Sequence, residues 1–306
     1  MRTRVSTSVA LSAAAVLALT ACAGSPDPSP TTTSSPTSTA VADPTNLGEL
    51  ERAVIDEGLV DSASFQVDTG QGSTLTIQLF WDDVPSAADQ LAAFTEVDRR
   101  IDELPDRRPE ATQIVLSTTR PDGGFSGIQT GYDPGTEVLT GMLEAVDGTV
   151  CHSANLARRD TGDGSGERAI LDLRCAVEAT DAVGLAGSYD EVTGIGTGIA
   201  GVDATTWEVS IQRRSTSEAL LRLDAGPVDG RQQVLVDAMT TAVGAGAARL
   251  TVIDSGTSVV VAGFADAGQS GLCTTLVDQM TAAGVERASA RLQLRDAQDW
   301  ACNLNP

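Results

Sequence analysis

The sequence predicts an α+β fold of three tandem βαββαβ units that follow a disordered stalk. The main observation is a tripeptide that recurs with spacings of 92 and 94 residues, as Asp68-Thr69-Gly70, Asp160-Thr161-Gly162 and Asp254-Ser255-Gly256. Each copy follows one apolar, strand-like run and precedes another, which is the pattern of a hairpin turn. Helical patterns flank each hairpin on both sides, which indicates a repeat of mixed secondary structure.

The elements of the repeat follow one order: helix, strand, turn, strand, helix, strand. Helical patterns precede the three turns at Leu47–Glu57, Thr136–Val146 and Arg231–Val243. Further helical patterns follow them at Ser86–Leu104, Ala179–Ile199 and Gly268–Ala283. Strand patterns close the units at Thr112–Thr118, Thr205–Gln212 and Ala288–Arg295. Because the tripeptides recur every 92 to 94 residues, each unit is no longer than this spacing, which is near the lower end of the size of an independent domain.

Two more strand candidates, Ser126–Gly131 and Glu218–Ala225, each begin 58 residues after the turn aspartate of the preceding unit. They supply a leading strand to the second and third units, so the expected arrangement is a split-βαβ sandwich with helices on one face of an antiparallel sheet. The expected limits of the three units are 47–120, 121–214 and 215–306.

Composition limits the partners of the chain. The 306 residues include 20 Arg, no Lys and 42 acidic residues, which gives a net charge of −22. Such a surface repels phosphate backbones and anionic headgroups, so nucleic acid is not an expected partner. Aromatic residues make up only 3% of the chain, so its cores must consist mostly of Ala, Val, Leu and Ile.

The N-terminus has the pattern of an export signal. Arg2 and Arg4 precede the apolar run Val9–Leu19, which is too short for a membrane span. The residues that follow, Leu19-Thr20-Ala21-Cys22, resemble the lipobox of bacterial lipoproteins. The resemblance implies that residues 1–21 are removed and that Cys22 is acylated, which places the protein on the extracytoplasmic face of the cell membrane. An ordinary secretory signal with a chance cysteine is the alternative.

A stalk is expected to follow. Residues 22–46 are almost wholly Ser, Thr, Pro, Ala and Asp, a composition that buries nothing and favours an extended chain. Its full reach at about 3 Å per residue is roughly 70 Å.

Four cysteines remain in the mature chain, and an even number in an exported protein favours disulfides. Cys151 and Cys175 lie symmetrically about the loop of the second hairpin, so they should face each other across it. Cys273 opens the last helical pattern and Cys302 follows the last strand, so this pair can fix the C-terminus. The crossed pairings are the alternatives.

The third unit resembles a BON domain, a small module of bacterial envelope proteins with a βαββαβ-like, ferredoxin-like element order. The resemblance rests on Leu250-Thr251-Val252, the turn at Gly256, Val259–Val261, Gly263, and Gly284-Val285 before Arg291-Leu292-Gln293-Leu294. Gly201-Val202 before Trp207–Ile211 repeats this ending in the second unit, whereas the first unit lacks the Gly-Val pair. The resemblance implies association or a membrane-proximal role, and no catalytic residues.

Candidate catalytic residues are few. His152 is the only histidine, and no nucleophile motif accompanies it. The tripeptides at Asp68 and Asp254 resemble the catalytic loops of aspartic proteases, in which two carboxylates share a proton. However, a third copy exists at the same position of the repeat, and a turn favours Asp and Gly there for its own reasons. We therefore expect turns, and no enzyme.

No metal or cofactor site is expected. Asp160, Asp163 and Glu167 could bind calcium in a Gly-rich loop, but they lack the alternating spacing of a calcium loop. Trp81, Trp207 and Trp300 are expected to pack in the core or at its edge.

The sequence thus predicts an exported, lipid-anchored binding or scaffolding module of the cell envelope. A module that binds a lipid or a cationic small molecule in a cleft between units is the alternative, and an acid protease using Asp68 and Asp254 is a remote third hypothesis.

Overall fold

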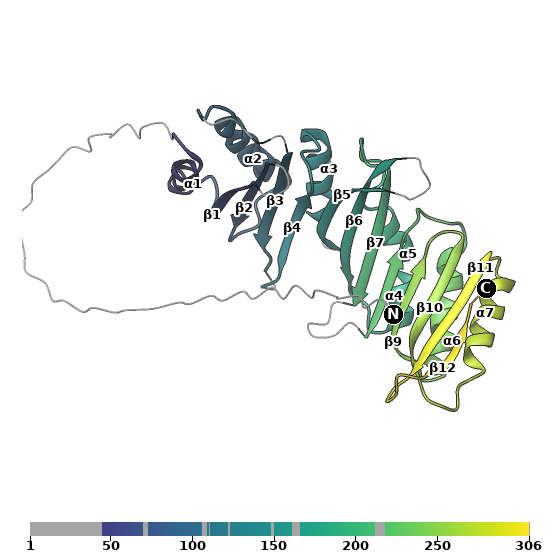
Figure 1. Ribbon diagram of the computed structural model, residues 1–306. Helices are drawn as coiled ribbons and strands as arrows, with labels where there is room; N and C mark the ends of the chain where they lie inside the picture. Colours follow the sequence, from purple (N-terminus) through teal and green to yellow (C-terminus); the bar gives the residue numbers. More distant parts are fainter. Residues whose placement is uncertain are drawn as a thin grey trace, which may run out of the picture. The chain divides into compact units, whose positions relative to one another are not determined.

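We analysed a computed structural model of the chain, which describes residues 45–69, 73–105, 109, 111–121, 123–147, 150–160, 166–211 and 218–305. The expected signal segment, Cys22 and nearly all of the expected stalk lie outside these residues. The described part forms one compact unit of mixed helix and strand (Figure 1).

A helix lies at each of the six segments that the sequence predicts to be helical. The helices are α1 (Leu47–Asp56), α2 (Ala87–Asp102), α3 (Thr136–Val146), the short pair α4 (Ala182–Gly187) and α5 (Tyr189–Thr193), α6 (Arg231–Gly244) and α7 (Leu272–Ala282). Polar side chains begin several of them: the side chains of Asn46, Ser86 and Asp181 accept hydrogen bonds from backbone N–H groups in the first turns of α1, α2 and α4.

Among the described residues, twelve strands form a single mixed sheet in which the spatial order equals the order along the chain. They are β1 (Ser62–Asp68), β2 (Thr74–Trp81), β3 (Ala111–Thr119), β4 (Phe125–Thr130), β5 (Cys151–Asp160), β6 (Glu167–Val177), β7 (Ala204–Ile211), β8 (Ala219–Leu223), β9 (Ala248–Asp254), β10 (Ser258–Ala265), β11 (Arg287–Leu294) and β12 (Trp300–Leu304). Antiparallel and parallel pairs alternate along the sheet, from β1–β2 antiparallel and β2–β3 parallel to β11–β12 antiparallel.

The prediction of three βαββαβ units is wrong, because all the strands belong to this one sheet. The strands that a helix connects are direct neighbours, as β2 and β3 are, whereas a split-βαβ unit would place another strand between them. The hydrogen-bonded pairs β3–β4 and β7–β8 also span the two expected limits between units.

The observed repeat is shorter than the predicted one. Each helix or helix pair is followed by two strands that form an antiparallel hairpin, which gives six αββ blocks along the described residues. The blocks begin at residues 47, 87, 136, 182, 231 and 272, a spacing of 40 to 49 residues. The recurring tripeptide marks only every second hairpin, so the sequence repeat corresponds to two blocks.

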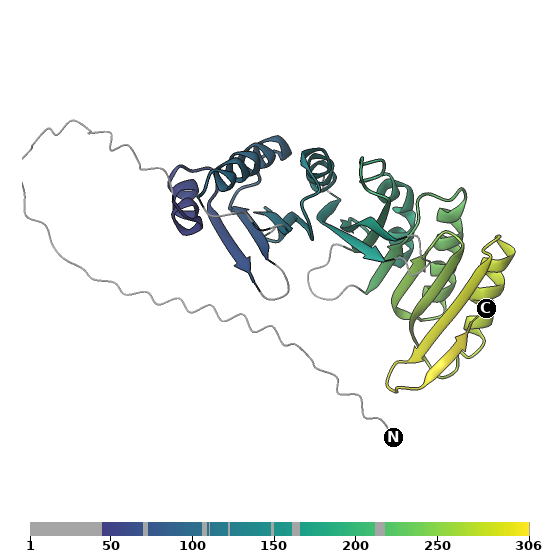
Figure 2. The same cartoon turned by 45° about the horizontal axis from the view of Figure 1, so that its top comes forward.

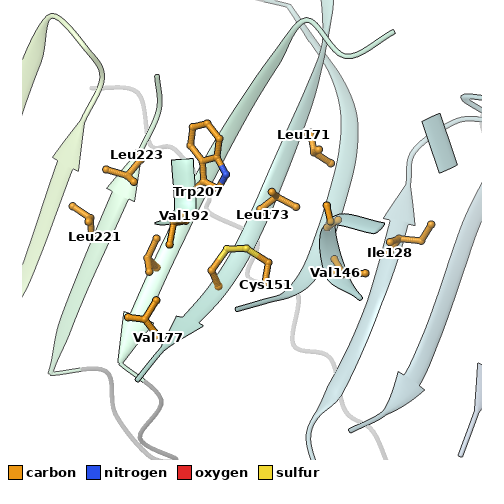
Figure 3. Packing of buried hydrophobic residues seen from close by; sticks show 14 of the residues in the cluster. Ile128, Val146, Cys151, Leu171, Leu173, Val177, Val192, Trp207, Leu221 and Leu223 are labelled. Atoms are coloured by element: carbon orange, nitrogen blue, oxygen red, sulfur yellow. A yellow bond between two sulfur atoms is a disulfide. The ribbon is translucent and has the colours of Figure 1, made fainter. Parts of the chain in front are cut away.

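Buried and more exposed residues alternate along the strands, and the buried apolar residues of the strands lie on the same face of the sheet. Residues that pair across strands, such as Leu173 with Trp207 and Val209 with Leu221, are all buried, whereas the residues between them are more exposed. We call the two sides the covered face and the open face. All the helices lie on the covered face (Figures 1 and 2), and the apolar side chains from β4 to β8 gather there (Figure 3).

Tight helix packing closes the core between the third and fourth blocks. A Cβ atom at Gly141 of α3 would lie 2.9 Å from side-chain atoms of Ile199, in the segment after α5. Any larger residue at position 141 would collide with Ile199. The glycine therefore lets that segment lie directly against α3.

Candidate functional site

The two cysteine pairs in the structure are the ones that the sequence favours. Cys151 and Cys175 are direct cross-strand partners in β5 and β6, with Cα atoms 3.8 Å apart, and their disulfide lies among the buried side chains of the covered face (Figure 3). Cys273 in α7 bonds to Cys302. Cys302 was expected just after the last strand, but it lies in the additional edge strand β12, so this disulfide joins that edge to the helix layer.

The turn at Asp254 is built from its own side chain. Oδ1 of Asp254 accepts a hydrogen bond of 2.9 Å from the backbone N–H of Gly256, which is an Asx turn. Gly256 has a φ of +82°, a left-handed conformation that glycine adopts without steric cost. The Asp-Ser-Gly tripeptide thus has a structural explanation as a turn.

Asp254 is also part of a buried ion pair. Its side chain is 2% exposed, and Oδ2 lies 3.4 Å from Nε of Arg231, which is 7% exposed and begins α6. Arg231 also donates to the carbonyl oxygen of Gly256. Burial raises the pKa of Asp254, although the hydrogen bond from Gly256 and the charge of Arg231 oppose this shift. Burial likewise raises the pKa of Tyr189, which lies beside this pair.

The two aspartates of the protease hypothesis are not brought together. Asp68 ends β1 and Asp254 ends β9, eight strand positions apart in the sheet. Asp68 is exposed, whereas Asp254 is buried and bonded to Arg231 and Gly256. A pair of carboxylates that share a proton must be in direct contact, which this arrangement does not provide.

His152 lies next to a cavity of about 740 Å³ at one end of the sheet, between α3 and α5. The strand has an irregularity between Cys151 and Ser153, and His152 is half-buried. The other polar groups of the cavity are Arg120, Ser126, Asp147, Glu178, Ser188 and Glu191. Three carboxylates against one arginine make the cavity a candidate site for a cationic molecule.

No metal site is found among the residues that the structure describes. Of the three calcium candidates, Asp163 lies outside those residues, Asp160 is at the end of β5, and Glu167 begins β6.

The three tryptophans divide between core and edge. Trp81 and Trp207 are buried, and their indole Nε1–H groups donate to the backbone carbonyls of Leu59 and Ile195 at 3.0 and 2.9 Å. Trp300 in β12 is 48% exposed.

The sequence predicted helices on one face of the sheet, but the opposite, open face was not identified as a candidate site. Over its central strands, charged residues of opposite sign are neighbours across the strands. In the strand register, Arg174 lies opposite Glu208, and Glu208 lies opposite Arg222. These groups line a groove of about 410 Å³, in which Asp172 is bonded to Arg159 and Thr206. Alternating polar residues in β6 and β7 are the signal that could have identified this face.

None of the described helices is long and apolar enough to cross a membrane. No protein-family model, no curated protein and no solved structure matches the chain. The functional assignment therefore depends on the sites themselves.

Proposed function

We propose that this chain is an exported, lipid-anchored cell-envelope protein that acts as a non-catalytic binding module, and that the open face of its sheet is the recognition surface. The single observation that carries the proposal is that one face of the sheet holds the buried core while no described element covers the other. An exposed sheet face of this kind offers a rigid row of alternating side chains to a partner.

The proposed anchor rests on the sequence alone. The lipobox resemblance at Leu19–Cys22 implies an acylated Cys22, and the net charge of −22 opposes any direct attraction to anionic lipids. A Cys22→Ala variant should therefore leave the membrane fraction after cell disruption. Retention of this variant in the membrane would contradict acylation at Cys22.

The recognition surface can be tested by photo-crosslinking in intact cells. A photoreactive residue at Gln78, Gln129 or Gln293 on the open face should produce an adduct of defined mass with an envelope component. The same residue at Thr95, an exposed position on α2, is the matched control and should give no such adduct. Adducts from Thr95 alone, or from none of these positions, would contradict the proposal.

A second candidate function is the binding of a cationic small molecule in the cavity beside His152. The carboxylates of Asp147, Glu178 and Glu191 favour such a ligand by charge. A thermal-shift measurement with diamines and divalent metals should then raise the melting temperature, because ligand binding stabilises the folded state by mass action. Glu191→Gln should reduce the shift, and an unchanged shift would exclude this cavity as the site.

A further inference from the structure

The C-terminal part of the open face has an unusual charge distribution. Strands β10, β11 and β12 contain no acidic residue, and the only one in β9 is Asp254, which is buried on the covered face. The whole chain, in contrast, has 42 acidic residues against 20 basic ones. On the open face these four strands therefore contribute only basic charged side chains, although Glu218 and Asp181 line a pocket beside Arg249.

Apolar side chains occupy the centre of this surface. Ile253 pairs with Val260 across β9 and β10, and Ala262 and Phe264 continue the same face of β10. All four are only half-buried. They form a contiguous apolar area, because their strands are neighbours and their positions alternate with those of the core.

Arginines surround the apolar centre. Arg287 and Arg291 are exposed on β11, and the guanidinium of Arg249 lies 5.9 Å from the ring centroid of Phe264. Among the described residues, no carboxylate forms an ion pair with these three arginines; Arg291 is hydrogen-bonded to the side-chain oxygen of Asn305. We call Ile253, Val260, Ala262 and Phe264 with these three arginines the arginine-rimmed patch.

The rest of the open face differs from this patch. Over β6–β8 the charges are matched within the sheet, since Glu208 lies between Arg174 and Arg222. Over β1–β3 the open face is mostly uncharged, with residues such as Gln66, Thr76 and Gln78. Unmatched positive charge around an apolar centre is thus specific to the C-terminal strands.

We propose that the arginine-rimmed patch docks an acidic segment of a partner protein that has apolar side chains between its carboxylates. This inference rests on the proposed function and specifies the partner of the same open face. Arginine binds carboxylates with two parallel hydrogen bonds, and an apolar centre with a polar, arginine-rich rim is the usual anatomy of a protein interface.

The chemistry of the patch favours a protein segment over other occupants. A polyanion without apolar groups would leave Ile253, Val260 and Phe264 in contact with water. The chain's own segment 22–46 contains only two acidic residues, Asp27 and Asp43, and therefore does not match the three arginines.

The test uses the full-length Cys22→Ala chain and a fluorescent 12-residue peptide of alternating Glu and Leu or Phe. Fluorescence anisotropy should give a Kd on the order of 10–100 μM, in the range of weak peptide interfaces. Arg287→Glu with Arg291→Glu should weaken binding at least tenfold, and binding of the unmodified chain should weaken as salt increases. Arg52→Glu with Arg99→Glu, on the exposed surfaces of α1 and α2, is the control with an equal change in net charge.

Several outcomes would overturn the inference. It fails if the Arg287/Arg291 double variant binds the peptide as well as the unmodified chain does, or if the control pair weakens binding equally. It also fails if the chain binds sulfated dextran but not the peptide, because the occupant would then be a polyanion. It fails if the double variant instead dissociates a dimer in sedimentation, because the patch would then join two copies.

Failure of this inference is distinguishable from failure of the proposed function. If crosslinks form from Gln78 or Gln129 and persist in the Arg287/Arg291 double variant, the open face binds its partner elsewhere. If no open-face position crosslinks at all, the proposed function itself is wrong.

Discussion

The covered and the open face of the sheet use neighbouring residues of the same strands for different purposes. In β6, Leu173 is fully buried and Arg174 is exposed, and in β7 the same holds for Trp207 and Glu208. The covered face provides the apolar area that holds the helices, whereas the open face contributes little burial and presents charge. A mutation should therefore affect either stability or recognition, according to the face on which it lies.

The largest expected effect is at Trp207. Trp207→Ala should reduce the free energy of unfolding by about 3–5 kcal/mol, because it removes a large buried side chain and the hydrogen bond to Ile195. Its neighbour on the open face is the control: Glu208→Ala should change the free energy by no more than about 0.5 kcal/mol. Urea denaturation measures both, and equal effects would contradict the division between the faces.

A similarly large effect is expected at the buried ion pair. Arg231→Met should cost about 3–5 kcal/mol at pH 7, because it leaves the Asp254 carboxylate buried without its partner. Burial raises the pKa of Asp254 above 3.8, so Asp254 becomes neutral in the folded state before it does in the unfolded state. The loss should therefore shrink as the pH falls through the folded-state pKa of Asp254.

Asp68, the exposed aspartate of the first tripeptide, gives the matched comparison. Asp68→Asn, at the end of β1, should change the stability by about 0.5 kcal/mol or less. Denaturation curves of both variants between pH 7 and pH 4 measure the difference. A pH-independent loss in Arg231→Met would contradict the role assigned to the Asp254 carboxylate.

An intermediate effect on stability is expected from the disulfide that joins α7 to the edge strand β12. The double variant Cys273→Ser/Cys302→Ser should lose roughly 3 kcal/mol in the chain-entropy view of disulfides. Hydrogen exchange should increase first in β12, because that edge strand is bonded on only one side. Peptide mapping without reduction should recover Cys151 with Cys175 and Cys273 with Cys302, and crossed pairs would contradict the strand register.

The smallest effect is expected on the outer surface of the helices. Hydrogen bonds from Arg99 and Arg100 lower the pKa of Glu96 to about 2, and Arg100 also reaches Glu57 of the preceding block. Arg99→Gln with Arg100→Gln should return the pKa of Glu96 towards 4.5, as measured by carbon NMR titration. The stability should barely change at pH 7, because exposed ion pairs contribute little. An unchanged pKa would contradict these contacts.

Local elements were predictable from the sequence because their causes are local. Thr136–Val146 was predicted and observed as a helix with the same limits, and Asp68, Asp160 and Asp254 each end the first strand of an antiparallel pair. Apolar periodicity and turn chemistry determine such features within a few residues. The weakly apolar β12 was missed, since its five residues give little signal.

The connection between blocks was not predictable in the same way. The sequence pattern predicts discrete split-βαβ units, in which right-handed crossovers pass over an intervening strand. In the structure, each crossover joins adjacent strands, strand direction reverses from one parallel pair to the next, and all helices stay on one face. Successive crossovers must then have opposite hands, so some of them depart from the usual preference.

The sequence by itself determined the helices, the hairpins, the favoured cysteine pairs and the acidic charge, because each depends on neighbouring residues or on composition. Only the tertiary structure decided that six αββ blocks share one sheet, that Asp254 meets Arg231, and that Arg249 lies over Phe264 while Arg291 lies opposite Ala262. These features depend on which strands pair with one another over long distances in the sequence. Many such pairings bury a similar apolar area, so the local hydrophobic pattern of the sequence cannot distinguish them.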